Sequence, residues 1–210
     1  MLTINVTHVT LIVMGRKTDN KVKEEILEKV ISAMSQNGLN TLSLRGIAQE
    51  IGVSARMLVY HFESYDALIN LLFINLSTRH KSILKNLMSE NEDKTFVQVS
   101  QIFIETIYSA ENKKPLVLFL ELYTKALRDP GKYSKFFDEV LHNWISEVES
   151  ILASECGNKS RLYATMIMSF YRGLMLDWLA TNDIGRIYET NKAFNMLIAD
   201  LMKERPKARK

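Results

Sequence analysis

Hydrophobic residues recur at helical spacing along most of the chain. The first apolar stripe has a spacing of four residues and consists of Val22, Ile26, Val30 and Met34. Polar residues 18–20 offer N-cap oxygens before this stripe, and Gly38 suits the position just after a helix. The pattern therefore predicts a first helix over about residues 20–37.

Similar patterns, separated by capping and helix-breaking residues, predict helices along the rest of the chain. Ser43, Ser54 and Ser64 are placed to cap three of them, and Asp129–Pro130–Gly131 is a strong stop. The further predicted ranges are 44–51, 54–62, 64–90, 94–110, 115–128, 133–155, 159–181 and 187–204. About nine helices and no strand are expected, so the predicted fold class is all-α.

Composition fits a globular helical protein and narrows the chemistry. Hydrophobic residues make up 47% and charged residues 24% of the 210 residues, with only 3 prolines. Cys156 is the single cysteine and the four histidines are scattered, so we expect no disulfide, metal site or cofactor. A lone cysteine is compatible with the reducing cytoplasm, which is the expected location.

The net charge of +3 is not evidence for nucleic-acid binding, because it comes from the C-terminus. Residues 203–210 hold five basic residues and one acidic residue; without them the chain has 22 basic and 23 acidic residues. A basic tail is therefore expected over residues 205–210. Evidence for a nucleic-acid partner has to come from local motifs.

The N-terminus differs from the rest of the chain. Residues 1–13 are apolar and β-branched, too short to span a bilayer, and lack the features of a signal peptide. We expect Met14 to be the functional start and residues 1–18 to be a disordered or mis-assigned extension and arm; a real additional strand or arm is the alternative. Arg16 and Lys17 either reach DNA from such an arm or are simply solvated.

The segment 43–62, SLRGIAQEIGVSARMLVYHF, has the pattern of a helix-turn-helix. Ala48 supplies the small residue needed where two helices cross, and Gly52 allows a left-handed turn four residues later. The second helix would then begin after Ser54 and present an exposed face, which in such motifs enters the major groove. A generic helical hairpin is the alternative.

Residues 58–62, LVYHF, and 64–68, SYDAL, resemble the signature of the DNA-binding domain of TetR (tetracycline repressor) family regulators. That pattern is Leu-Tyr-x-His-Phe, one residue, then Ser-Lys-Glu-x-Leu. Val59 and Tyr65 depart from it at positions where the family often has phosphate-contacting Tyr and Lys. The resemblance implies a DNA-binding domain over residues 19–66 and an effector-binding and dimerisation domain over 67–204.

The expected DNA contacts follow from side-chain chemistry and from the resemblance. Arg56 is the best base-reading candidate because a guanidinium binds guanine O6 and N7 together, whereas Ala55 and Met57 suit thymine methyl groups. The other candidates, mainly for the phosphate backbone, are Ser43, Arg45, Ser54, Val59, Tyr60, His61 and Tyr65. The two capping serines have an alternative role as caps only, and His61 as a packing residue.

The larger domain resembles the effector domain of the same family around residues 121–130, ELYTKALRDP. The resemblance implies a pocket for a small, apolar effector, for which the candidate lining residues are Phe103, Phe119, Tyr123, Trp144, Met166 and Phe170; ordinary core packing is the alternative. It also implies a homodimer through the last two helices. The candidate dimer residues are Leu162, Phe170, Leu174, Trp178, Phe194, Leu197 and Leu201, and Gly173 would permit close helix approach.

These observations predict a sequence-specific regulator, a repressor that a small molecule releases from a double-stranded DNA operator. The alternatives are a ligand sensor or protein-interaction module with weak or lost DNA binding and, less favoured, a helical enzyme. The sequence contains no glycine-rich phosphate loop, nucleophile elbow or metal-ligand spacing, so we expect no enzymatic activity.

Overall fold

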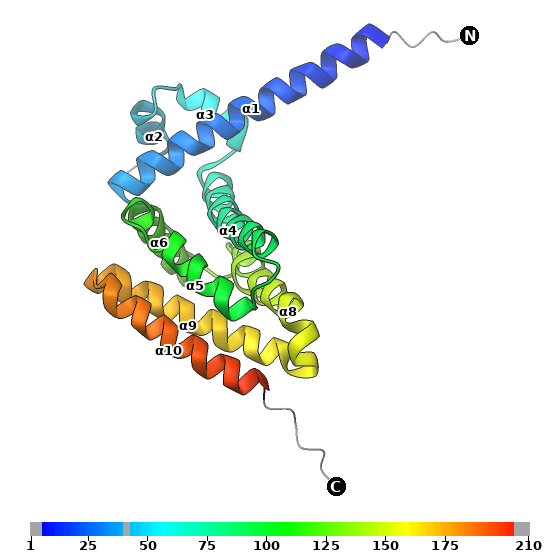
Figure 1. Ribbon diagram of the computed structural model, residues 1–210. Helices are drawn as coiled ribbons and strands as arrows, with labels where there is room; N and C mark the ends of the chain where they lie inside the picture. Colours follow the sequence, from blue (N-terminus) through cyan, green and yellow to red (C-terminus); the bar gives the residue numbers. More distant parts are fainter. Residues whose placement is uncertain (1–5, 40–42, 204–210) are drawn as a thin grey trace. The chain divides into compact units, whose positions relative to one another are not determined.

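The computed structural model of the chain describes the backbone of residues 6–39 and 43–203, and the side chains of these ranges from residue 19 onward. The described residues form helices joined by short turns, without a strand (Figure 1). The all-α fold expected from the hydrophobic pattern is confirmed. The expected basic tail, residues 205–210, lies outside the described residues.

Two compact units divide the chain between Leu72 and Phe73. The first unit contains α1 (Val6–Asn37), α2 (Leu44–Glu50), α3 (Ala55–Phe62) and the start of α4 (Tyr65–Glu90). The division falls six residues beyond the boundary expected from sequence. The first turns of α4 carry Leu68, Ile69 and Leu72, which are buried, so this part of the helix belongs to the core of the first unit.

The N-terminal helix begins much earlier than predicted. α1 starts at Val6, not near residue 20, and its backbone is continuous through residues expected to be a disordered extension. No proline interrupts this stretch, and the one glycine, Gly15, costs only about 1 kcal/mol within a helix. The polar residues 18–20 therefore lie inside the helix, where their amides do not need side-chain caps.

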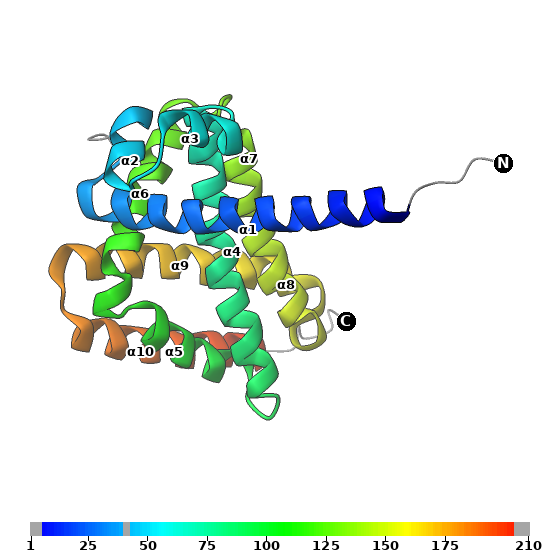
Figure 2. The same ribbon diagram turned by 90° about the horizontal axis from the view of Figure 1, so that it is seen from above.

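The second unit contains the rest of α4 and all later helices. These are α5 (Phe96–Ile107), η1 (Ala110–Asn112), α6 (Lys113–Arg128), α7 (Ser134–Phe137), η2 (Asp138–His142), α8 (Asn143–Cys156), η3 (Gly157–Lys159), α9 (Ser160–Thr181) and α10 (Ile184–Lys203). α9 packs against α8 on one side and α10 on the other, and α10 also packs against α5 (Figure 2). The buried core of this unit lies among these helices.

The predicted helix over residues 133–155 is wrong in one respect, because it is interrupted. Its middle, η2, is a π-helical turn between α7 and α8. The apolar positions Phe136, Val140 and Trp144 remain buried across the interruption, so the wider turn preserves the inward face that the pattern predicted. Gly157, at φ +53°, ends α8 as expected.

Candidate functional site

The α2–α3 pair of the first unit has the predicted helix-turn-helix geometry. The Ser43 hydroxyl accepts a hydrogen bond from the Gly46 amide at 3.2 Å, and the Ser54 hydroxyl accepts one from the Met57 amide at 3.1 Å, so both serines are N-caps. Gly52 adopts φ +71°, and Ala48 is buried where the two helices meet. The structure therefore has the small side chain, the left-handed turn and the second cap at the positions that the sequence indicated.

Helix α3 has a buried face and an outward face. Leu58 and Phe62 are fully buried and fix the helix to its unit. Arg56, Met57, Val59 and Tyr60 are exposed, and 70% of Tyr60 is accessible. The exposed face thus combines a guanidinium, a phenol and apolar groups, which are the side-chain types that read base edges and bind phosphates.

The remaining predicted DNA contacts have different surroundings. Arg45 on α2 is exposed, and Ala55 is partly buried at the start of α3. His61 is buried at 9% exposure, with Nδ1 3.8 Å from a carboxylate oxygen of Asp19. This position suits the packing role considered for His61 better than a phosphate contact.

Tyr65, at the start of α4, is engaged within the first unit. Its hydroxyl donates a hydrogen bond to the Leu39 carbonyl at 3.3 Å. Burial, assisted by the nearby Asp66 carboxylate, raises the pKa of the Tyr65 phenol, so it stays protonated. A phosphate contact from this hydroxyl would have to share or replace the bond to Leu39.

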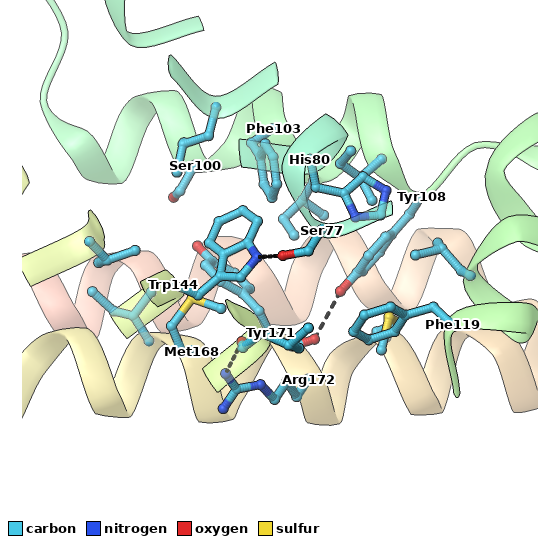
Figure 3. A pocket seen from close by; sticks show the side chains of 18 of the residues that line it. Ser77, His80, Ser100, Phe103, Tyr108, Phe119, Trp144, Met168, Tyr171 and Arg172 are labelled. Carbon is cyan, nitrogen blue, oxygen red and sulfur yellow. Dashed lines mark hydrogen bonds between the residues drawn. The ribbon is translucent and has the colours of Figure 1, made fainter. Parts of the chain in front are cut away.

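A cavity of about 100 Å³ lies in the core of the second unit (Figure 3). Three of the residues predicted to line an effector pocket, Phe103, Phe119 and Trp144, do line it. Most of the other wall residues are also apolar, among them Ile104 and Met168. A cavity with this lining can enclose a small molecule with an apolar body.

The other three predicted lining residues lie elsewhere. Tyr123 packs with its ring edge against Phe136, with ring centroids 5.3 Å apart. Phe170 stacks on Phe194 at 3.7 Å, and Met166 is exposed on α9. Composition alone could not separate these residues from the lining, because aromatic and methionine side chains serve core, surface and pocket alike.

The polar side chains that line the cavity were not predicted. They are Ser77, His80, Ser100, Tyr108, Tyr171 and Arg172. Several link the walls: Trp144 Nε1 donates to Ser77 Oγ at 2.9 Å, the Tyr108 hydroxyl donates to the Tyr171 carbonyl at 2.9 Å, and Arg172 donates to the Val140 carbonyl at 3.3 Å (Figure 3). No motif marks these residues, since each is a single polar position within a helical pattern or at its end.

Burial controls the charge of the titratable groups at the cavity. It lowers the pKa of His80 to about 4, with a further contribution from the Arg79 charge, so the imidazole is neutral at pH 7. Burial also raises the pKa of the Tyr108 phenol well above its usual range. Arg172 keeps its charge, although burial lowers its pKa and Tyr123 raises it. Among the described residues that line the cavity, it is the one with a permanent charge.

The predicted dimer residues fall into three groups. Leu174 and Trp178 are buried in the core of their own unit, so they cannot form a face for a second chain. Phe170, Phe194 and Leu201 are partly buried. Leu162 on α9 and Leu197 on α10 are each 58% exposed.

Further exposed apolar side chains accompany these leucines. Met166 and Leu176 extend the face of α9, and Met196, at 65% exposure, extends that of α10. Gly173 lies on the α9 face, and a Cβ added there would meet nothing within 4 Å among the described residues. The predicted close approach at Gly173 is therefore not made within this chain.

Neither a metal centre nor a membrane span emerges from the described part of the chain. Its His, Cys, Asp and Glu side chains form no group of three that could hold a metal ion. None of its helices is both long and apolar enough to cross a bilayer.

Comparison with known proteins adds family information to this geometry. Residues 26–72 match the family model described as bacterial regulatory proteins, tetR family. This range includes α2, α3 and the start of α4. A search of curated proteins finds no match.

Solved structures match nearly the whole chain. A transcriptional regulator from Rhodococcus sp. Rha1 has a TM-score of 0.73 at 12% identity, with 88% of this chain and 99% of that chain covered. A TetR-family member from Streptomyces coelicolor A3 has a TM-score of 0.65 at 21% identity, with 81% and 95% covered. The multidrug-binding protein EbrR, complexed with imidazole, has a TM-score of 0.62 at 19% identity, with 90% and 98% covered.

At these identities the structural matches establish the fold of the described chain. Residues 26–72, which contain the helix-turn-helix, match the tetR family of bacterial regulatory proteins, so the N-terminal domain is of the TetR type.

Proposed function

We propose that this DNA-binding transcriptional regulator is a repressor whose affinity for its operator falls when a small molecule occupies the cavity of the second unit. The observation that carries the proposal is the outward face of α3, where Arg56, Met57 and Tyr60 are exposed on a helix fixed by buried Leu58 and Phe62. In helix-turn-helix proteins such a face enters the major groove. The largely apolar cavity of the second unit supports ligand control.

The exposed side chains divide the work of DNA recognition. Arg56 suits bidentate hydrogen bonding to guanine O6 and N7, and Met57 suits apolar contact with a thymine methyl group. Tyr60 and Arg45 suit phosphate contacts, which fix the position of the protein on DNA without reading sequence. Ser43 and Ser54 cap their helices, and each hydroxyl still has a proton to donate to a phosphate.

Binding to two half-sites requires two copies of the chain. The exposed apolar side chains of α9 and α10, led by Leu162, Met196 and Leu197, support a homodimer through this surface. The open space at Gly173 would let a second copy approach α9 closely. Two recognition helices would then engage half-sites about 34 Å apart.

Coupling between cavity and DNA is proposed to run through α4. This helix begins in the DNA-binding unit and continues into the second unit, where its Ser77 and His80 line the cavity. A ligand shifts only an equilibrium between states for which it has different affinities. A coupling of about 1–3 kcal/mol would lower operator affinity about 5–150-fold. EbrR, with its imidazole and malachite green complexes, is a protein of this fold that holds small molecules.

The test is to incubate the purified full chain with genomic fragments and to sequence the bound DNA. We expect enrichment of a palindromic site, with enrichment reduced for Arg56→Ala. Arg161→Ala, an exposed arginine on α9 of the second unit, is the matched control and should leave enrichment unchanged. A protein that enriches no sequence would contradict operator binding.

A ligand sensor with weak DNA binding is the second candidate. It is favoured by Tyr65, whose hydroxyl is already bonded to the Leu39 carbonyl, and by Val59, which cannot donate a hydrogen bond from its side chain. The same experiment separates the two functions, because a sensor would bind small molecules in the cavity without enriching an operator.

A further inference from the structure

The charge distribution at the cavity is one-sided. Arg172 lines it together with neutral Ser, Tyr and His side chains, and no Asp or Glu among the described residues lines it. The other walls are apolar, with Phe103, Trp144 and Met168 among them (Figure 3). Arg172 is therefore the one residue with a permanent charge among the described lining residues.

This guanidinium lacks an anionic partner. Arg172 is partly buried on α9, and its one hydrogen bond among the described residues is donated by Nη2 to the Val140 carbonyl at 3.3 Å. No carboxylate of the described residues forms a salt bridge with it. By contrast Arg161, on the same helix, pairs with the Glu149 carboxylate at 2.9 Å. A partly buried cation held by one neutral acceptor keeps several donors for a charged group.

We infer that the cavity takes a small organic anion, with an aromatic or alkyl body among the apolar walls and a carboxylate bound by Arg172. This inference rests on the proposed ligand control and names the chemical class of the ligand. A carboxylate matches the planar fork of a guanidinium and forms two charge-assisted hydrogen bonds with it. The same guanidinium repels a cation, and a neutral molecule leaves it without an anionic partner.

The size of the cavity limits the ligand. The cavity has a volume of about 100 Å³, against about 150 Å³ for an engineered apolar cavity that holds benzene, so the body of the ligand is limited to a single ring or a short alkyl chain. Benzoate is a one-ring anion of this kind, and benzyl alcohol and benzylamine are close to it in size and shape. These three molecules therefore separate the contribution of charge from that of the apolar body.

The experiment is calorimetric titration of the full chain with benzoate, benzyl alcohol and benzylamine at pH 7. We expect benzoate to bind at least about tenfold more tightly than the other two. Arg172→Met should remove this preference, lowering benzoate affinity about tenfold or more while changing benzyl alcohol affinity less than about twofold. Arg172→Lys should restore part of the preference for the anion, because it retains the positive charge.

Arg161→Met is the matched control, since it removes an exposed arginine from the same helix. If Arg172 only ties α9 to the π-helical turn, its loss should weaken all three ligands alike, and that outcome overturns the inference. Equal binding of the amine and the carboxylate, or no binding of any of the three, also overturns it. Circular dichroism of each variant verifies that it is folded.

Different results would contradict the proposed function and leave the anion site supported. Benzoate bound through Arg172 without any decrease in operator affinity would support the anion site and contradict ligand control of DNA binding. Enrichment of an operator in the absence of ligand tests the DNA-binding function independently of all three small molecules.

Discussion

Burial of the His80 imidazole should make the stability of the second unit depend on pH. The structure lowers the pKa of His80 from 6.5 to about 4, mainly through desolvation and in part through the charge of Arg79. The folded state therefore resists protonation, whereas the unfolded chain takes up a proton near pH 6.5. The contribution of His80 to the free energy of unfolding is therefore complete above pH 6.5 and is lost as the pH falls from there to about 4. Below that pH this group causes no further loss.

The magnitude follows from the difference between the two pKa values. Its full effect is about 3 kcal/mol, reached at or below pH 4. Between pH 7 and pH 5 the expected loss in the free energy of unfolding is about 2 kcal/mol. This is large enough to measure, because domains of this kind are stable by only about 5–15 kcal/mol.

Urea unfolding followed by tryptophan fluorescence is the appropriate assay. Both tryptophans, Trp144 and Trp178, lie in the second unit with His80, so their signal reports on that unit. Unfolding should be compared at pH 7, 6 and 5 at one protein concentration, since dimerisation also affects stability.

Two substitutions isolate the contribution of His80 from that of titrating carboxylates. His80→Leu and His80→Gln both remove the ionisable group, one with an apolar and one with a polar replacement. Both should reduce the loss of stability between pH 7 and pH 5 by about 2 kcal/mol relative to the unsubstituted protein. If both variants keep the original pH dependence, the reasoning about the buried imidazole is refuted.

Three further outcomes test the DNA-binding unit and the dimer. Arg56→Ala should cost about 1–3 kcal/mol at one operator position and relax base preference there, whereas Tyr60→Phe should weaken all sequences alike; competition binding to a library of operator variants distinguishes them. Gly52→Ala should destabilise the first unit by about 1–2 kcal/mol, measured by hydrogen exchange, because alanine is strained at φ +71°. The added Cβ would meet no other described atom within 4 Å, so the expected cost comes from the backbone conformation alone. Leu197→Glu should shift the protein towards monomer in light scattering and weaken operator binding, whereas Lys192→Glu, exposed on the same helix, should do so less; a dimer unaffected by Leu197→Glu would contradict the proposed interface.

The helix-turn-helix could be predicted in detail because its determinants are local. A cap at Ser54, a left-handed residue at Gly52 and a small residue at Ala48 each satisfy a backbone or steric requirement within a few residues. Such requirements do not depend on the rest of the fold, so they can be recognised from the order of the amino acids.

Predictions failed where the local pattern had no distinct signal. The start of α1 was placed near polar residues 18–20, because potential caps also occur inside helices and the sequence does not show which of them are used. The π-helical turn η2 was missed because its residues continue the apolar face of a helix without a proline or glycine. A change from α to π hydrogen bonding depends on the packing of neighbouring helices, which a single segment does not encode.

The cavity lining shows the same distinction between composition and packing. Phe103 and Trp144 line the cavity, whereas Tyr123 belongs to an aromatic cluster with Phe136, and Phe170 stacks on Phe194. Hydrophobicity predicts that a side chain is buried, not which of several interiors receives it.

The polar lining residues also show which forces determine the positions of the cavity walls. Apolar contacts tolerate sliding, whereas a hydrogen bond fixes one atom against another. The bond from Trp144 to Ser77 joins α8 to α4, and the bond from Arg172 to Val140 joins α9 to η2. Each contributes about 1 kcal/mol, and the apolar walls offer few alternative partners.

A bound molecule that replaces the protein partner in one of these hydrogen bonds would remove its contribution to holding two helices together. That contribution is close to the lower end of a typical allosteric coupling. Ser77 is the critical position, because it lies on the helix that continues into the DNA-binding unit. The proposed release from DNA therefore requires that a molecule bound at Arg172 also alters the Ser77–Trp144 contact, which joins α4 to α8.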